Sequence, residues 1–368
     1  MISLLIGYAA TACGFMPVVT TTVTWTTPAP LSGYAATHSV NGALVQAVIV
    51  AAGTAVYAPF VRLSEHMQQE RIRIDLEDLL RVFAEESELP ALGNQFLERS
   101  DNVGAVAKVV VEQLSRDLRA GRIPVFYQPQ VDEFGGVCGV EALLRWRFRG
   151  KPLPPPLVIK LAREAGIYGD LTDCILDTAV ADSARFRNAL GRPLMVSVNI
   201  SPYEANDEAF VRKAVRLVEE AGLQNSFCLE VTEEAALERF GKIAENLHNL
   251  FGHGILAAID DFSMGQTSLK YLQGSNFQFV KLDGALVRQL LDSPRSQDIV
   301  RAIVGLGQDL NFQVVAEYVE SRELRDLLLS LNCRIFQGYL YSPAVPPAEL
   351  VRFVLDRDSA RQRPVAGS

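Results

Sequence analysis

Seven polar residues follow short apolar runs of the sequence, and together they can hold two divalent metal ions. The runs are β-branched and bounded by helical or turn-rich stretches, which predicts buried parallel strands. Because the carboxyl ends of the strands in an α/β barrel open on one face, these side chains are expected to meet there. Five of them are carboxylates, which repel one another unless cations bridge them. Such oxygen ligands select magnesium or manganese rather than zinc. The seven residues are Glu141, Asn199, Glu230, Asp260, Asp261, Lys281 and Glu317.

Each of these residues also has a simpler interpretation. A carboxylate after a strand, such as Glu141, is commonly a solvated loop residue, and Lys281 can be half of a structural ion pair. Asn199 can supply turn chemistry before a helix, and Asp260 with Asp261 can cap one. The conjunction of all of them at strand ends favours a single site.

The composition limits the classes of protein to consider. The chain has 368 residues, 49% of them apolar, and a formal net charge of -8. The apolar share is ample for a large core. The acidic balance argues against a protein that binds duplex nucleic acid, because such proteins present a basic face. Five cysteines and four histidines show no metal-ligand spacing, which argues against a zinc enzyme and favours a reduced compartment.

The first 61 residues contain no Asp, Glu, Lys or Arg, and Arg62 is the first charged side chain. Residues 2–19 and 43–61 are apolar enough, and about long enough, to form two transmembrane helices. A pair of buried core helices is the alternative. A cleavable signal peptide fits poorly, because the start is not basic and a second apolar stretch follows. Residues 1–62 are therefore expected to be a membrane segment.

The rest of the chain divides by pattern. Residues 63–102 are expected to be a helical connector, with apolar residues on one side up to Pro90. Residues 103–120 form an amphipathic pattern closed by Gly121, and strands then alternate with helices to about residue 350. This alternation predicts one α/β domain over residues 103–354, a TIM-type (β/α)8-like barrel. The polar residues 355–368 are expected to be a flexible tail.

Eight motifs of this region resemble the EAL family of cyclic di-GMP phosphodiesterases, over about residues 103–354. The signature is residues 139–146, Gly-Val-Glu-Ala-Leu-Leu-Arg-Trp. The other motifs recur in the family's order, at residues 126–130, 198–201, 229–233, 260–262, 280–283, 315–320 and 336–339. The resemblance implies a hydrolase that opens one phosphodiester of cyclic di-GMP to give linear pGpG, and so lowers a bacterial second messenger. It also implies a homodimer formed through the barrel.

The resemblance assigns roles to positions. Two ions of Mg²⁺ or Mn²⁺ are implied, the first on Glu141, Asn199, Glu230 and Asp260, and the second on Asp260, Asp261 and Glu317. Lys281 is implied beside the attacking water, with Gln337 in support, so that the catalytic set is Lys281, Glu141, Asp260, Glu317 and Gln337. Substrate contacts fall on Gln128, Leu143, Arg145 and Asp283. Glu233 and Glu320 are implied to support the loop after the aspartate pair.

The chain departs from the family pattern at a few positions. Ser263, Met264 and Gln266 differ in the loop after the aspartate pair, and Tyr318 stands where a glycine is usual. Arg334 replaces a usual acidic residue near Gln337. None of these changes removes a metal ligand, so the expected effect is on the rate. The alternative function is a catalytically weak or inactive cyclic di-GMP receptor that regulates a membrane or sugar-transport partner.

A second resemblance covers the membrane segment. Residues 23–37 and 57–60 look like the C-terminal part of the membrane (IIC) subunit of lactose/cellobiose-type phosphotransferase permeases. Only the end of such a permease is present, which is expected to serve as a membrane tether. The expected location is the bacterial inner (cytoplasmic) membrane, with the barrel facing the cytoplasm.

Overall fold

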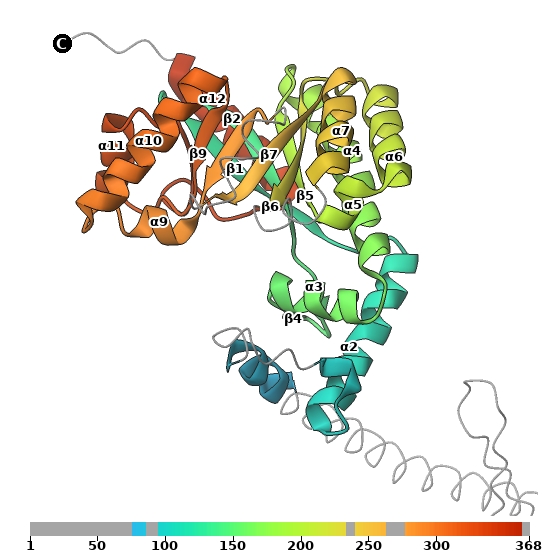
Figure 1. Ribbon diagram of the computed structural model, residues 1–368. Helices are drawn as coiled ribbons and strands as arrows, with labels where there is room; N and C mark the ends of the chain where they lie inside the picture. The colour runs from blue at the N-terminus through green and yellow to red at the C-terminus, as the bar shows by residue number, and fades with distance from the viewer. Residues whose placement is uncertain (1–75, 86–94, 233–239, 263–276, 363–368) are drawn as a thin grey trace, which may run out of the picture. The chain divides into compact units, whose positions relative to one another are not determined.

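The computed structural model describes residues 76–85, 95–232, 240–262 and 277–362 (Figure 1). Several predictions lie outside these ranges: the two membrane helices, the permease-like segment, Glu233, and the altered loop positions Ser263, Met264 and Gln266. Within the described ranges, no helix combines the length and the apolar character needed to cross a membrane.

Eight strands close into a barrel in the order β1-β10-β9-β8-β7-β6-β5-β2, which confirms the predicted TIM-like architecture (Figure 1). The barrel strands are β1 (Val125–Asp132), β2 (Val137–Leu144), β5 (Met195–Ile200), β6 (Phe227–Thr232), β7 (Ile255–Phe262), β8 (Phe279–Leu282), β9 (Gln313–Ala316) and β10 (Ile335–Gln337). Neighbours from β2 through β10 pair in parallel.

The first strand breaks the expected alternation, because β1 is antiparallel to both β2 and β10. The sequence interpretation of strictly alternating strands and helices is therefore wrong at this point. Residues 133–136 are too few for a crossover helix, so the chain turns back as a hairpin. Asp132 Oδ1 closes the turn by accepting hydrogen bonds from the backbone N–H groups of Phe134 and Gly136, at 2.9 and 2.7 Å. Gly135 supplies the positive φ of +82° that the turn requires.

Helices surround the strands. The longer ones are α2 (Asn102–Arg119), α3 (Pro155–Glu164), α4 (Tyr168–Leu190), α6 (Glu208–Glu220), α7 (Phe240–Gly252), α10 (Pro294–Leu310), α11 (Arg322–Ser330) and α12 (Pro347–Gln362). The shorter elements are η1 (Phe96–Glu98), β3 (Arg147–Phe148), β4 (Lys151–Pro152), α5 (Pro202–Asn206) and α9 (Gly284–Arg288). In α6 the buried residues Phe210, Val211, Ala214 and Val218 form one stripe, which joins the core cluster of the barrel.

Both ends of the predicted domain can be compared with the structure. Helix α2 matches the helix predicted for residues 103–120, and its N-cap Asp101 accepts a hydrogen bond from the N–H of Gly104 at 3.0 Å. In the connector, residues 76–85 are helical. The flexible tail predicted from residue 355 is wrong for residues 355–362, because α12 continues to Gln362. An ion pair of 3.0 Å between Asp358 and Arg192 ties this last part of α12 to the residues before β5.

Candidate functional site

The strand register places the candidate residues on the inside of the barrel. Glu141 lies within β2 and pairs across the ladder with Gln128 of β1, so the two side chains share a face. Asn199 of β5 is likewise paired with Glu230 of β6. The sequence places these residues at strand ends, but Glu141 and Glu230 stand inside their strands. Both carboxylates are consequently buried, at 5% and 2% exposure.

A bulge in β7 accounts for two consecutive aspartates at one site. Successive residues of a regular strand point to opposite faces, so Asp260 and Asp261 are not expected to act together in an ordinary ladder. Here the pairing of β7 with β8 shifts register between Ile259 and Phe262, and Asp261 takes a left-handed φ of 56°. Aspartate tolerates that conformation better than most residues, and bulges re-aim side chains in this way. Both carboxylates border the same cavity.

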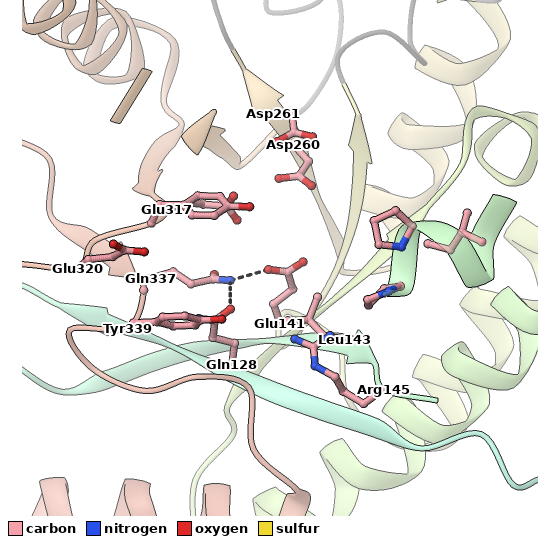
Figure 2. Close-up of a pocket in the computed structure, with 15 residues that line it drawn as sticks. Gln128, Glu141, Leu143, Arg145, Asp260, Asp261, Glu317, Glu320, Gln337 and Tyr339 are labelled. Carbon is pink, nitrogen blue, oxygen red and sulfur yellow. Dashed lines mark hydrogen bonds between the residues drawn. The ribbon is translucent and has the colours of Figure 1, made fainter. Parts of the chain in front are cut away.

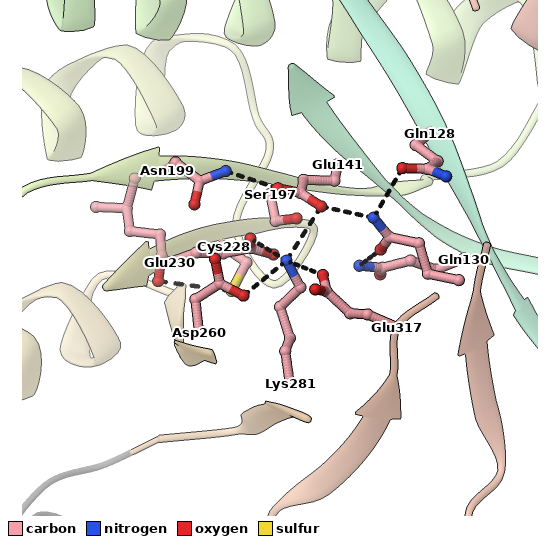
Figure 3. Close-up of polar contacts among 12 residues, drawn as sticks. Gln128, Gln130, Glu141, Ser197, Asn199, Cys228, Glu230, Asp260, Lys281 and Glu317 are labelled. Atoms are coloured by element: carbon pink, nitrogen blue, oxygen red, sulfur yellow. Dashed lines mark hydrogen bonds and ion pairs between the residues drawn. The ribbon is translucent and has the colours of Figure 1, made fainter. Parts of the chain in front are cut away.

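Lys281 lies at the centre of the acidic residues (Figure 3). Its side chain is 1% exposed. Its Nζ lies 2.7 Å from Glu230 Oε2, 2.7 Å from Glu317 Oε1, 3.0 Å from Glu141 Oε2 and 3.1 Å from Asp260 Oδ1. These four carboxylates raise the pKa of Lys281 well above its ordinary value, although burial alone lowers it. Lys281 is thus the internal counterion of the site.

A chain of amides extends from the acidic cluster. Gln337 Nε2 donates to Glu141 Oε2 at 2.6 Å and to Gln128 Oε1 at 3.3 Å (Figure 2). Gln130 Nε2 donates to Gln337 Oε1 at 3.0 Å. Asn199 Nδ2 donates to the other oxygen, Glu141 Oε1, at 2.6 Å. Both oxygens of Glu141 are therefore held by amide donors. Gln337, for which the sequence predicts a supporting role, joins Glu141 to Gln128 and Gln130.

Two groups of three carboxylates are close enough to share a metal ion. Glu141, Glu230 and Asp260 form one group, and Asp260, Asp261 and Glu317 form the other, each with one oxygen per residue within 4.8 Å of the others. Asp260 Oδ1 is buried and accepts no hydrogen bond from any described residue, although Lys281 lies nearby. Hard divalent cations prefer such oxygen donors. The residues present therefore fit metal ions, with Asp260 common to both groups.

The burial of these carboxylates changes their acidity. Burial raises the pKa of Glu230 well above its ordinary value, that of Glu317 to about 8 and that of Asp261 to about 6. The neighbouring carboxylates add to each shift and Lys281 opposes it. Glu141 differs, because Lys281 and its amide donors outweigh burial and lower its pKa. The single positive charge of Lys281 thus does not balance all the carboxylates of the site, and divalent cations can supply the missing positive charge.

These raised pKa values predict that metal affinity increases with pH. Asp261 and Glu317 carry protons below about pH 6 and pH 8, and a metal ion must displace those protons. Below its pKa, each group costs about tenfold in affinity per pH unit. Calorimetric titration with Mn²⁺ at pH 6 and pH 8, in buffers of different ionisation heat, measures the affinity and the protons released. Equal affinities at the two pH values, with no proton release, contradict the prediction.

A cavity of about 520 Å³ opens beside the acidic residues (Figure 2). Figure 2 shows Glu317, Glu320, Gln337 and Tyr339 on one side, with Leu143 and Arg145 opposite. The full lining is Gln128, Glu141, Leu143, Arg145, Pro155, Pro156, Ile159, Asp260, Asp261, Glu317, Tyr318, Glu320, Gln337, Gly338 and Tyr339.

The substrate-contact residues predicted from the sequence divide into two groups. Gln128, Leu143 and Arg145 line the cavity, as does Glu320, for which loop support was expected. Asp283 does not line it. Its side chain instead accepts a hydrogen bond from the N–H of Ala285 at 3.0 Å and caps α9, although its charge helps to raise the pKa of Asp261.

Sequence reasoning missed part of this lining. The first two turns of α3 bring Pro155, Pro156 and Ile159 to the cavity, and no sequence pattern indicates which way that helix faces. Gln130 does not line the cavity but donates to Gln337, and it stands two residues after Gln128 on a strand and therefore on the same face. That spacing could have identified it. Tyr318 was noted only as a departure from a pattern, not as a lining residue.

Comparisons with known proteins agree with this geometry. The EAL domain matches residues 111–344. A cyclic di-GMP phosphodiesterase of Pseudomonas aeruginosa is 34% identical over 227 residues, which cover 61% of this chain and 38% of that protein. Cyclic di-GMP phosphodiesterase NbdA of the same organism is 33% identical over 264 residues, covering 71% and 34%. The chain therefore spans less than half the length of these curated relatives.

Solved structures give the same fold. The PaMucR phosphodiesterase in complex with c-di-GMP is 28% identical, with a TM-score of 0.62, and the match covers 66% of this chain and 99% of that one. The EAL enzyme Bd1971, in a form with cAMP and cyclic di-GMP bound, is 25% identical with a TM-score of 0.64, covering 76% and 75%.

Proposed function

The chain belongs to the EAL domain family, and on that basis we propose that it is a metal-dependent phosphodiesterase that hydrolyses cyclic di-GMP to linear pGpG. The observation that carries the proposal is the pair of carboxylate groups that share Asp260 beside a cavity lined by Arg145. Two relatives named as cyclic di-GMP phosphodiesterases, and a phosphodiesterase structure in complex with c-di-GMP, support the same reaction and ligand.

The ions would be held by the two sets of three carboxylates, with Asn199 beside the first set. Carboxylate and amide oxygens favour Mg²⁺ or Mn²⁺. When bound, a pair of such ions supplies an ionised water and charge stabilisation for phosphodiester cleavage. Arg145 can bind two phosphate oxygens with its planar fork. Gln337 orients Glu141 through its hydrogen bond to that carboxylate. Gln128, which accepts a hydrogen bond from Gln337, is placed to orient the substrate.

Lys281 acts on the proton of the attacking water in this proposal. In the metal-free site its charge is fixed by four carboxylates. If those carboxylates bound divalent cations, the cations would neutralise their negative charge, and the pKa of Lys281 would fall. The ammonium form would then position the water by donating a hydrogen bond to it, and the neutral amine, which becomes populated as the pKa approaches neutrality, would accept the proton.

The test is an assay of the purified full chain, in detergent, with cyclic di-GMP and either Mg²⁺ or Mn²⁺. Linear pGpG is the expected product, and Ca²⁺ is expected to suppress its formation because the larger ion tolerates irregular coordination. Binding of cyclic di-GMP without pGpG under either activating metal would overturn the proposal in favour of a receptor.

We also propose that residues 1–62 tether the enzyme to the bacterial inner membrane, with the barrel in the cytoplasm. The support is the absence of charged residues before Arg62, together with two apolar stretches of membrane length and the resemblance to a permease end. Fractionation without detergent tests this, and recovery of the full chain in the soluble fraction contradicts it. A homodimer formed through the barrel is proposed as well, and ultracentrifugation in detergent at several concentrations measures it.

A further inference from the structure

Tyr318 has an unusual backbone conformation next to a metal-ligand candidate. It directly follows Glu317, at the carboxyl end of β9, with a φ of 54°. This left-handed region is easy for glycine and unfavourable for a bulky side chain. The position therefore retains a large aromatic residue against its backbone preference.

The fold provides a niche for the Tyr318 ring on α9. A Cβ added to Gly284 would lie 2.2 Å from Cδ2 and 2.4 Å from Cε2 of the ring, so only glycine leaves room there. One turn later on the same helix face, the Arg288 guanidinium lies over the ring, with Cζ 4.5 Å from its centroid. The two contacts hold the ring in place.

Tyr318 borders the cavity next to the second set of carboxylates. Tyr318 lines the cavity beside Glu317 and Asp261, whereas Gly284 and Arg288 do not. The residue remains 47% exposed and is one of the residues that line the cavity, so part of it is accessible from that space. The charges of Glu317 and Asp261 reach the phenol, because they add to the effect of burial in raising the pKa of Tyr318.

We propose that Tyr318 is a specificity-determining residue, whose ring stacks on a guanine base of the substrate next to the phosphodiester that is cleaved. This inference rests on the proposed function for the identity of the substrate. A fixed aromatic ring loses little freedom on stacking, and every nucleobase offers a planar surface. The ring therefore distinguishes a nucleotide from a sugar phosphate, while polar groups of the cavity distinguish among bases.

The test compares two probes that differ only in the base, GMP and ribose 5-phosphate. Binding of each to the full chain in detergent with Mn²⁺ is measured by calorimetry for Tyr318→Gly, Tyr318→Phe and Gly284→Ala. Glycine suits the backbone at this position, so Tyr318→Gly is expected to fold. Loss of stacking is expected to weaken GMP binding about tenfold or more in Tyr318→Gly. Gly284→Ala displaces the ring and is expected to act in the same direction, whereas Tyr318→Phe retains stacking and binds GMP as the native protein does.

Ribose 5-phosphate binding is expected to remain unchanged in all three variants. Tyr203, an exposed tyrosine of α5 that does not line the cavity, provides the matched control Tyr203→Ala, with no effect on either probe. Equal weakening of both probes in Tyr318→Gly, or unchanged GMP binding, overturns the inference. Because the readout is binding, a chain without hydrolytic activity still tests the stacking, and failure of one proposal is separable from failure of the other.

Discussion

Lys281→Met is expected to destabilise the metal-free protein by about 3–5 kcal/mol, because it removes the buried partner of four carboxylates. The loss is expected to increase as the pH rises, since Glu230 and Glu317, whose pKa values are already raised, must then ionise without a counterion. Added Mn²⁺ is expected to stabilise the variant more than the native protein. Urea unfolding in detergent, with and without a chelator, measures these differences.

The same variant is expected to retain metal but to lose turnover by about 10²–10⁴-fold, the usual contribution of a group that moves a proton. The matched control is Lys213→Met. Lys213 lies at the surface, 3.2 Å from Asp173 and 3.1 Å from Asp177, and such pairs contribute about 0–1 kcal/mol. Full turnover in Lys281→Met, together with unchanged metal-free stability, contradicts both roles given to this lysine.

Glu141→Ala is expected to abolish measurable turnover, with a loss of at least about 10³-fold, or ~4 kcal/mol in the barrier. The change removes a ligand of the first carboxylate group. It also leaves Gln337 Nε2 and Asn199 Nδ2 without the acceptor that each now contacts at 2.6 Å. Metal affinity is therefore expected to fall with activity, which distinguishes this variant from Lys281→Met.

Glu220→Ala is the control for Glu141→Ala, since Glu220 is an exposed residue of α6 and its loss is expected to alter stability by no more than about 0.5 kcal/mol. Calorimetric titration with Mn²⁺ and the pGpG assay are run on both variants. If Glu141→Ala binds Mn²⁺ as tightly as Glu220→Ala does, Glu141 is not a metal ligand.

The sequence indicates which residues form the site more clearly than it indicates how they meet. Carboxylates that follow apolar strands predict a shared acidic rim in any α/β barrel, and Glu141, Glu230 and Asp260 do meet. The bulge that turns both Asp260 and Asp261 to one face has no sequence signal, because it arises from pairing with β8. The number of carboxylates converging on Lys281 likewise depends on register, not on spacing along the chain.

Three features that the sequence does not indicate involve specific polar contacts: the direction of β1, the N-cap of α9 and the end of α12. A four-residue turn closed by Asp132 makes β1 antiparallel, where strand and helix patterns alone predict a parallel start. Asp283 caps α9 by accepting a hydrogen bond from the N–H of Ala285, and its expected contact with the substrate stays a prediction. Helix α12 continues past residue 354, and Asp358 in this part of the helix pairs with Arg192, a contact between residues far apart in the chain that no local pattern indicates.

The most direct test of the account follows the oxygen atom of the attacking water. The full chain is incubated with cyclic di-GMP and Mn²⁺ in water enriched in oxygen-18, and the products are examined by mass spectrometry. The account predicts linear pGpG that carries a single labelled oxygen on its new terminal phosphate, with no product when a chelator is present. Recovery of intact cyclic di-GMP with Mn²⁺ bound, or pGpG formed without a divalent metal, would contradict it.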